Sequence, residues 1–326
     1  MNDGPAVGDG RVWIYCPANR VTGGPEALHQ LARALTDLGV DARLVYYPES
    51  GAPHSVPGEY REYAPRIATH GADEPGDVVV VPEVATRRLR GIQRARRIVW
   101  WLSIDNYLVK RSLLGLLRGL AYRDTPLRIS QLTTCSHCAQ SAYAADFLRR
   151  KGIAAALLTD YLRPVHHSDD GPDAGGDRGR VVLFNPKKAG GFTRRVMRLT
   201  ASQCDWVGLE AMSPEQVAAA MRRARLYVDF GPHPGRDRMP REAAVNGCCV
   251  LTGRRGAAAY EADLPIPEWY KVDERVRDAD VLAAGKIAAI LSDYAHHHAR
   301  LAAYRAWIAR QRDEFTRQVR AVFLKS

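Results

Sequence analysis

Short apolar runs alternate with amphipathic helical segments along the first half of the chain. The first run, 11–16, ends at turn residues, and apolar residues spaced three and four apart follow it until Gly39. Further apolar runs lie at 42–47, 77–82, 97–102, 129–134 and 155–158. Near-continuous apolar strands separated by helices are typical of a parallel sheet that is covered on both faces. This half therefore predicts one Rossmann-like domain.

The alternation stops at a polar stretch rich in glycine, aspartate and proline and then begins again. The stretch 165–179 has the composition of a linker. Strands are predicted after it at 180–184, 206–208, 226–230 and 248–252. A long helical stretch runs from about residue 278, and the pattern predicts no clear break between 296 and 323. A chain of 326 residues is long for one core, which also favours two domains.

The sequence thus predicts an α/β protein of two Rossmann-like domains that face a cleft. The N-terminal domain is expected to cover 1–164 and the C-terminal domain 180–326, with the linker 165–179 between them. The C-terminal helix is expected to pack back toward the N-terminal domain. Two similar α/β halves joined by a linker bind ligands most readily in the cleft between them.

Composition narrows the class of protein and of partner. Hydrophobic residues make up 46% of the chain and charged residues 25%, as in ordinary soluble proteins. No apolar run reaches the roughly 18 residues that span a bilayer, and the N-terminal residues do not resemble a signal peptide, so we expect a cytoplasmic protein. The formal net charge of +11 favours anionic partners. No nucleic-acid-binding motif accompanies that charge, so a nucleic-acid partner is not expected.

The six cysteines are scattered and lie mostly inside predicted strands, which is typical of buried thiols. Cys135 and Cys138 have the spacing of a metal-binding pair. A tetrahedral site needs a second pair of ligands, and the sequence has no second pair of this spacing. We therefore expect no bound metal.

Three loops at predicted strand ends have the composition of phosphate-binding loops. Gly23 and Gly24 precede a helix, where paired glycines let the backbone approach a phosphate or sugar. Asn185, Lys187 and Lys188 follow the first strand of the second half. The two lysines are expected to point to different sides, so that one of them reaches a diphosphate. The alternatives are an ordinary tight turn and a solvated pair of lysines.

The third loop joins the strand 226–230 to a helix that is predicted to begin near Pro240. Arginine suits bidentate contacts with phosphate. The residues of this loop that are predicted to bind an anionic ligand, through backbone or side chain, are His233, Gly235, Arg236, Arg238 and Arg241. Glu242 is expected in the first turn of the helix, facing the same mouth. Cations for a diphosphate and one carboxylate for ribose hydroxyls suit a nucleotide sugar.

These segments resemble those of GT-B-fold glycosyltransferases. The segment 22–26 resembles the glycine-rich loop of the N-terminal domain, and 241–252 resembles a conserved segment of the retaining enzymes related to glycogen and sucrose synthases. The resemblance, which is strongest to bacterial transferases of polysaccharide or secondary-metabolite pathways, implies that Glu242 binds the ribose and that Lys187 or Lys188 binds the diphosphate. It also implies catalysis without a metal or cofactor, with a nucleotide diphosphate sugar as donor.

The chain departs from that family in two places, so the stereochemistry of transfer is open. The family has an additional glutamate seven or eight residues before the one that binds the ribose. The corresponding positions here are 233–235, which have no carboxylate. Cys249 replaces the proline before the last strand. An inverting reaction would need a general base, for which Asp105 and His137 at strand ends of the first domain are candidates. The alternative for Asp105 is a helix cap.

The predicted function is transfer of a sugar from a nucleotide diphosphate sugar to the hydroxyl of a glycan, a lipid-linked or a small-molecule acceptor. The alternatives are a nucleotide-sugar-binding protein without transferase activity and a nucleotide-sugar 2-epimerase. Leucines at 113, 116, 117 and 120 form a stripe flanked by cations. Such a helix either packs on its own sheet or makes a peripheral contact with the inner face of the membrane.

Overall fold

The computed structural model describes residues 10–48, 55–112, 114–115, 125–163 and 178–324. The chain divides into two compact units. The first unit consists of Met1–Asp160 together with Asp313–Ser326, and the second of Tyr161–Arg312. The leucine stripe predicted around 113–120 lies outside the described residues.

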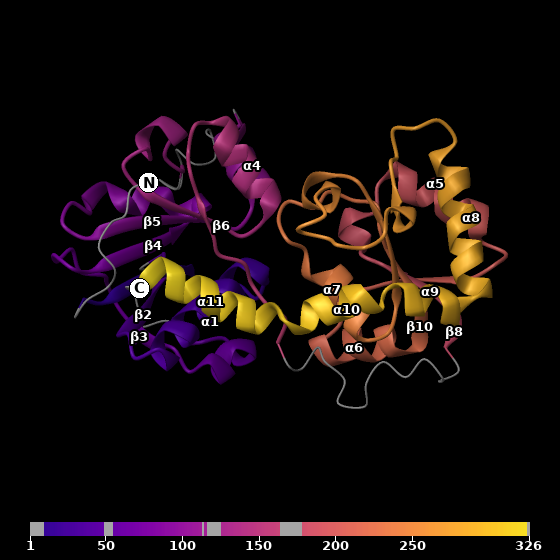
Figure 1. The fold of residues 1–326 in the computed structure, drawn as a ribbon, viewed down its shortest axis with the longest axis horizontal. Coiled ribbons are helices and arrows are strands. Elements are labelled where there is room, and N and C mark those ends of the chain that lie inside the picture. Colours follow the sequence, from indigo (N-terminus) through magenta and orange to yellow (C-terminus); the bar gives the residue numbers. More distant parts are fainter. Residues whose placement is uncertain (1–9, 49–54, 113, 116–124, 164–177, 325–326) are drawn as a thin grey trace. The chain divides into compact units, whose positions relative to one another are not determined.

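A parallel sheet forms the centre of the first unit (Figure 1). Within the described part of this unit it has seven strands in the order β3-β2-β1-β4-β5-β6-β7. The strands are β1 (Val12–Pro17), β2 (Ala42–Tyr47), β3 (Arg66–Ala68), β4 (Val78–Pro82), β5 (Arg96–Trp101), β6 (Ser136–Ala139) and β7 (Ala156–Leu157). The apolar runs thus predicted β1, β2, β4, β5 and β7 within one or two residues, and the short β3 carried no such signal.

Helical segments connect these strands. They are α1 (Gly23–Asp37), η1 (Gly58–Tyr63), η2 (Glu83–Gly91), α2 (Ile104–Arg111), η3 (Ile129–Gln131) and α4 (Ala142–Arg150), where η marks a 3-10 helix. The apolar residues of α1 face the core, as its helical spacing predicts.

The strand predicted at 129–134 is wrong. Residues 129–131 form η3, and the strand β6 comes later. Leu132 is the only fully buried residue of the predicted stretch, whereas all residues from His137 to Gln140 are buried. The local hydrogen bond from the Leu132 amide to the Ile129 oxygen makes a turn, and the continuous burial further on selects the strand.

The last helix, α11 (Gln311–Phe323), contributes most of its length to the first unit. Phe315 is fully buried and stacks on Trp100, with 6.4 Å between ring centres. The Gln318 side-chain oxygen accepts a hydrogen bond of 2.7 Å from the Thr159 amide. These contacts confirm the predicted return of the C-terminal helix to the N-terminal domain.

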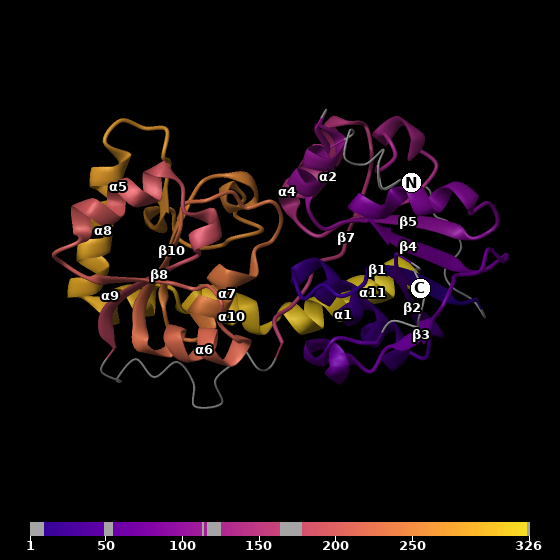
Figure 2. The same ribbon diagram turned by 180° about the vertical axis from the view of Figure 1, so that it is seen from behind.

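The second unit is built around another parallel sheet (Figure 2). Its described residues contain five strands in the order β12-β11-β10-β8-β9. They are β8 (Gly179–Phe184), β9 (Asp205–Gly208), β10 (Ala224–Asp229), β11 (Cys249–Gly253) and β12 (Lys271–Val272). The first four confirm the predicted strands, and two parallel α/β units confirm the predicted fold class.

Helices flank this second sheet. They are α5 (Gly191–Thr200), α6 (Pro214–Arg223), α7 (Arg238–Val245), α8 (Ala279–Ser292), α9 (Tyr294–Arg300) and α10 (Ala302–Ala309), with the 3-10 helices η5 (Pro186–Lys188), η6 (Gly256–Ala259) and η7 (Glu268–Tyr270). The helix predicted to run unbroken from 296 to 323 is therefore divided among α9, α10 and α11. Helix α5 packs against α8, and α6 packs against α7.

Strand order locates the natural binding edge of each sheet. From β8 the chain moves to β9 on one side and then to β10 on the other, so the loops after β8 and β10 diverge at a topological switch point. The equivalent point of the first sheet lies between β1 and β4. Ligands of open α/β sheets bind outside the carboxyl ends of the strands at such points.

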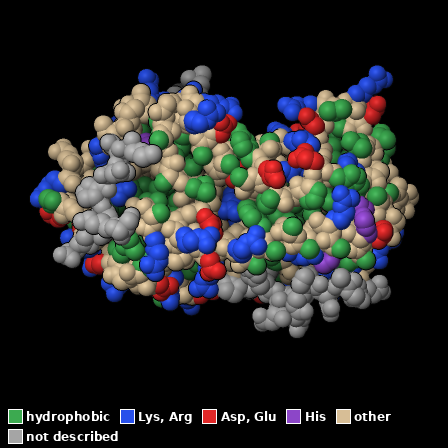
Figure 3. Space-filling view, viewed as in Figure 1, with side chains coloured by type: hydrophobic (Ala, Val, Ile, Leu, Met, Phe, Trp, Pro, Cys, Tyr) green, Lys and Arg blue, Asp and Glu red, His purple; other side chains and the backbone are tan. Residues whose placement is uncertain are grey.

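On the face shown in Figure 3, the Lys and Arg side chains of each unit are scattered and do not gather in one patch. No helix among the described residues combines the length and the apolar character of a membrane span.

Candidate functional site

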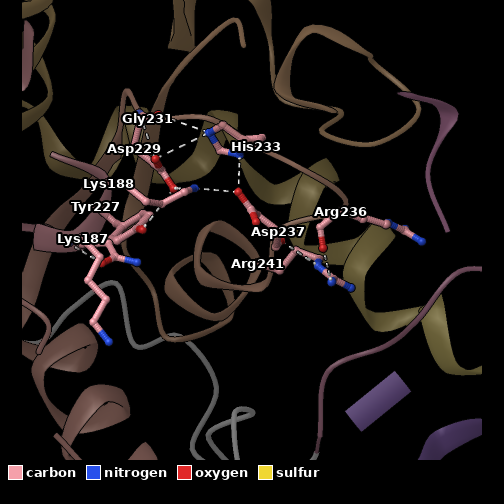
Figure 4. Close-up of polar contacts among 10 residues, drawn as sticks. Lys187, Lys188, Tyr227, Asp229, Gly231, His233, Arg236, Asp237 and Arg241 are labelled. Carbon is pink, nitrogen blue, oxygen red and sulfur yellow. Dashed lines mark hydrogen bonds and ion pairs between the residues drawn. The ribbon is translucent and has the colours of Figure 1, made fainter. Parts of the chain in front are cut away.

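A partly buried salt bridge joins the loops that leave β8 and β10 (Figure 4). Lys188 ends η5, directly after β8, and Asp229 ends β10. The Lys188 Nζ atom lies 2.5 Å from Asp229 Oδ2 and 2.6 Å from Asp237 Oδ2. Only 18% of the Lys188 side chain is exposed. The ammonium group therefore sits between two carboxylates at the switch point of the second sheet.

His233 completes this arrangement, and we call Lys188, Asp229, His233 and Asp237 the Lys188 cluster. The His233 Nδ1 atom is 2.7 Å from Asp237 Oδ2, and Nε2 is 3.3 Å from the main-chain oxygen of Asp229. Burial alone would raise the pKa of Asp237, but His233 and Lys188 outweigh it and lower that pKa. Burial likewise opposes the charge on Lys188, and the two carboxylates raise the pKa of Lys188 above its ordinary value.

Two glycines let the loops around the Lys188 cluster approach one another. A Cβ atom on Gly231 would lie 2.7 Å from Lys188 Cβ and 2.8 Å from the Lys188 main-chain oxygen. Gly256 begins η6 after β11 with a φ of +59°, and its Cβ would lie 2.1 Å from the His233 main-chain oxygen. Only glycine tolerates such close approach. Three loops are therefore packed backbone to backbone at this edge.

The Lys188 cluster also holds the only group of potential metal ligands in the part of the chain that the structure describes. One ligand atom from each of Asp229, His233 and Asp237 lies within 4.8 Å of the others. The Lys188 ammonium contacts both carboxylates. An ammonium group therefore already faces the two carboxylates of this group.

Helix α7 begins beside the Lys188 cluster and carries the predicted ribose ligand. Asp237 is the N-cap residue and the helix begins at Arg238, not near Pro240 as predicted. Glu242 thus lies just beyond the first turn rather than within it. Its side chain is 9% exposed, and Oε1 is 3.2 Å from an Arg238 guanidinium nitrogen. A paired cation and carboxylate therefore lie near the N-terminal end of α7.

The other two arginines of the predicted donor loop make contacts inside the second unit. Arg241 is 1% exposed and donates to the main-chain oxygens of Arg236 and Asp237, at 3.0 and 3.1 Å, and to Gln311 Oε1 at 2.8 Å. The Arg236 guanidinium lies 4.3 Å from the centre of the Trp307 ring. Both side chains therefore stabilise the conformation of the loop. The sequence composition did not predict this structural role.

The remaining predicted donor residues of the second unit lie close to the Lys188 cluster. Asn185 Oδ1 accepts a hydrogen bond of 3.0 Å from the Lys187 amide. The Lys187 side chain is exposed and points away from Lys188 in Figure 4, as expected for the adjacent pair. Gly235 lines a small cavity together with His233.

Gly23 and Gly24 open α1 in the first unit, shortly after β1 and at the switch point of that sheet. The Tyr60 hydroxyl accepts a hydrogen bond from the Thr22 amide and donates one to the Thr22 oxygen, both at 2.9 Å. A Cβ atom on Gly24 would make an ordinary contact with Leu102 at 3.7 Å. The loop is thus fixed by Tyr60, and the neighbouring side chains leave room for a larger residue than Gly24.

Asp105, one of the two candidates for a general base, lies in the first turn of α2. Ser103, and not Asp105, caps this helix through a hydrogen bond with the Asn106 amide. The Asp105 Oδ1 atom accepts a hydrogen bond of 2.8 Å from the Tyr143 hydroxyl. The geometry therefore does not support the helix-cap alternative for Asp105.

His137, the second candidate, lies in the core of the first unit. Trp101 Nε1 donates to His137 Nδ1 at 2.9 Å, and His137 Nε2 is 3.0 Å from the Leu132 main-chain oxygen. Burial lowers the pKa of His137. Both ring nitrogens are engaged, so this geometry fits a structural role better than that of a base.

Sequence reasoning missed Glu83, which follows β4 at the switch point of the first sheet. The side chain is 2% exposed, and its Oε2 atom accepts a hydrogen bond of 2.8 Å from the Leu102 amide. Burial raises the pKa of Glu83 to about 7, against the opposing effect of backbone hydrogen bonds. The detectable signal was a carboxylate directly after a buried strand.

Replacing Glu83 by glutamine should flatten the dependence of stability on pH. In the unfolded chain this carboxyl ionises near pH 4.5, whereas in the folded protein it keeps its proton up to about pH 7. The free energy of unfolding therefore falls as the pH rises through this window, by up to about 3 kcal/mol. Urea unfolding at pH 5 and pH 8 should show a larger fall for the wild type than for Glu83→Gln. The exposed Glu62→Gln is the matched control, and parallel curves for wild type and Glu83→Gln would contradict the assignment.

Comparison with known proteins gives fold relatives only. No family model and no curated protein sequence matches the chain. Similar solved structures include HepE of Anabaena in complex with UDP and glucose, at 10% identity and a TM-score of 0.67, covering 95% of this chain and 98% of that chain. Sucrose-phosphate synthase of Thermosynechococcus elongatus has 13% identity and a TM-score of 0.57, with 96% and 95% covered. The UDP-forming α,α-trehalose-phosphate synthase of Burkholderia vietnamiensis has 11% identity and a TM-score of 0.56, with 97% and 99% covered. The chain thus has the GT-B fold over nearly its whole length.

Proposed function

We propose that the protein is a glycosyltransferase that moves a sugar from a nucleotide diphosphate sugar to an acceptor hydroxyl. The observation that carries this proposal is the Arg238–Glu242 pair near the start of α7, beside the switch point of the second sheet. Two of the fold relatives named above are a sucrose-phosphate synthase and a trehalose-phosphate synthase, and the HepE crystal contains UDP and glucose. Cation and carboxylate at this edge suit a diphosphate and a ribose.

The second unit would bind the donor. Glu242 would accept hydrogen bonds from the ribose hydroxyls, and Arg238, with the exposed Lys187, would contact the diphosphate. The backbone amides of His233 and Gly235 would face the sugar, in the place where the chain lacks the family's additional glutamate. Stabilisation of the leaving diphosphate by fixed cations is the main catalytic contribution expected of such a site.

The first unit would bind the acceptor next to the loop that contains Gly23 and Gly24. If the reaction inverts the anomeric centre, Asp105 is the base that we favour, because its carboxylate is only partly buried and is oriented by Tyr143. If the reaction retains the configuration, no base is required. We propose that neither route needs a metal ion, since Lys188 neutralises the acidic group of the second unit.

Glu242→Ala should weaken binding of UDP and of uridine alike, by about tenfold or more, because a buried charged hydrogen bond to ribose is lost in both complexes. Isothermal titration measures both affinities. Asp205→Ala, which removes an exposed carboxylate at the opposite edge of the same sheet, should leave both unchanged. If Glu242→Ala binds uridine as tightly as the wild type does, the ribose role is excluded.

A further inference from the structure

We propose that Lys188 is a positioning residue: through Asp229, His233 and Asp237 it fixes the donor loop, instead of contacting the donor diphosphate. This inference rests on the proposed function and deepens it. Adjacent lysines after a strand predict that one of them reaches a phosphate, and Lys188 is the more buried of the two. The contacts of the Lys188 cluster assign it another role.

The charges of the Lys188 cluster compensate one another. The Lys188 ammonium contacts one carboxylate at 2.5 Å and another at 2.6 Å. Both His233 ring nitrogens face oxygen atoms: the Asp237 carboxylate at 2.7 Å and the Asp229 main-chain oxygen at 3.3 Å. One ammonium group stands against two carboxylates, so the cluster has no net positive charge to attract a diphosphate.

The backbone around Lys188 is also fixed in place. Gly231 packs so closely on Lys188 that a Cβ atom would be 2.7 Å from Lys188 Cβ. The Gly231 amide in turn donates to Asp229 Oδ1 at 3.1 Å. Releasing the Lys188 side chain toward a ligand would remove the ammonium partner of Asp229, whose side chain is 1% exposed, and such a loss is costly for a buried charge.

The position of the cluster explains how it would act on the donor. Asp237 is the N-cap residue of α7, and Arg238 and Glu242 lie within the next five residues of that helix. Lys188 therefore links the end of β8 to the start of the helix that carries both proposed donor contacts. Loss of this link should move the diphosphate contact and the ribose contact together.

The test is a double-mutant cycle of Lys188→Met and Asp237→Asn, with UDP and uridine as ligands in isothermal titration. We expect each single variant to lower the affinity for UDP and for uridine by a similar factor, about tenfold. The double variant should bind both ligands no more weakly than the single variant with the larger loss. Lys187→Met is the contrast, because loss of a diphosphate contact lowers the affinity for UDP and leaves the affinity for uridine unchanged.

A phosphate-contacting Lys188 gives a different pattern and would overturn the inference. Lys188→Met would then weaken UDP alone, and Asp237→Asn would leave UDP binding unchanged or tighter. If Lys188→Met does not fold, Asp237→Asn decides between the two patterns by itself. Urea unfolding of the same variants without ligand is an independent test. If the losses of unfolding free energy from Lys188→Met and Asp237→Asn are strictly additive in the double variant, the two side chains do not interact as described. A wild type that binds none of UDP, GDP, ADP and dTDP would overturn the proposed function itself, whatever the unfolding shows.

Discussion

Replacing Arg178 by methionine should destabilise the second unit by about 3–5 kcal/mol. Arg178 is 6% exposed and donates to three main-chain oxygens, those of Met221, Ala224 and Asn246, at 2.8 to 2.9 Å. These oxygens lie at the C-terminal ends of α6 and α7, where the helices leave carbonyl groups without partners of their own. Methionine fills similar space but leaves these buried oxygens without the charged donor.

The matched control for this prediction is Arg180→Met. Arg180 lies two residues further along, in β8, and also donates to main-chain oxygens, those of Gln203 and Leu291, but its side chain is exposed. We expect a loss below about 1 kcal/mol for Arg180→Met in urea unfolding. Equal losses for Arg178→Met and Arg180→Met would show that Arg178 does not fasten the two helices.

Gly256→Ala should cost at least about 3 kcal/mol, which is well above the cost of a left-handed alanine alone. A Cβ atom on Gly256 would lie 2.1 Å from the His233 main-chain oxygen and 2.9 Å from its carbonyl carbon. Both are backbone atoms, and the same oxygen accepts the Ala257 amide at 2.9 Å. The loop that contains His233 must therefore move, so UDP affinity should fall as well.

Gly39→Ala separates the two contributions to this loss. Gly39 has a φ of +82°, and a Cβ atom there would have no neighbour within 4 Å, so its substitution carries only the conformational cost, about 1–2 kcal/mol. Hydrogen exchange of peptides from each unit reports the local loss, because the two glycines lie in different units. If both variants lose the same free energy and UDP affinity is intact, the loops are not packed as described.

Most strands could be predicted because burial on both faces leaves a direct mark on the sequence. The run 77–82 became β4 and the run 42–47 became β2. The strand β12 has only two residues, one of which is Lys271, so no apolar run marked it. The strand β6 was misplaced because its segment contains His137, whose ring is satisfied by Trp101, a partner distant in sequence.

The candidate site was predictable by residue type and less so by role. Strand ends and glycines pointed to the loops that contain Lys188 and Arg241, because sheet topology brings such loops to one edge. The pairing of Lys188 with Asp229 and Asp237 spans 41 and 49 residues of sequence and depends on tertiary contacts. The same is true of Arg241, whose partner Gln311 is 70 residues away.

The most direct test of the proposed function is a transfer assay on the purified wild-type protein in the presence of EDTA. Thermal shift with UDP, GDP, ADP and dTDP first identifies the nucleotide that binds, and sugars carried by that nucleotide are then offered with glycan, lipid-linked and small-molecule acceptors. We predict a clear shift with at least one nucleotide, and release of that nucleotide coupled to a glycosylated acceptor without added metal. A shift without transfer or hydrolysis would favour a binding protein, and epimerised donor would favour an epimerase. No shift with any of the four nucleotides would contradict the account.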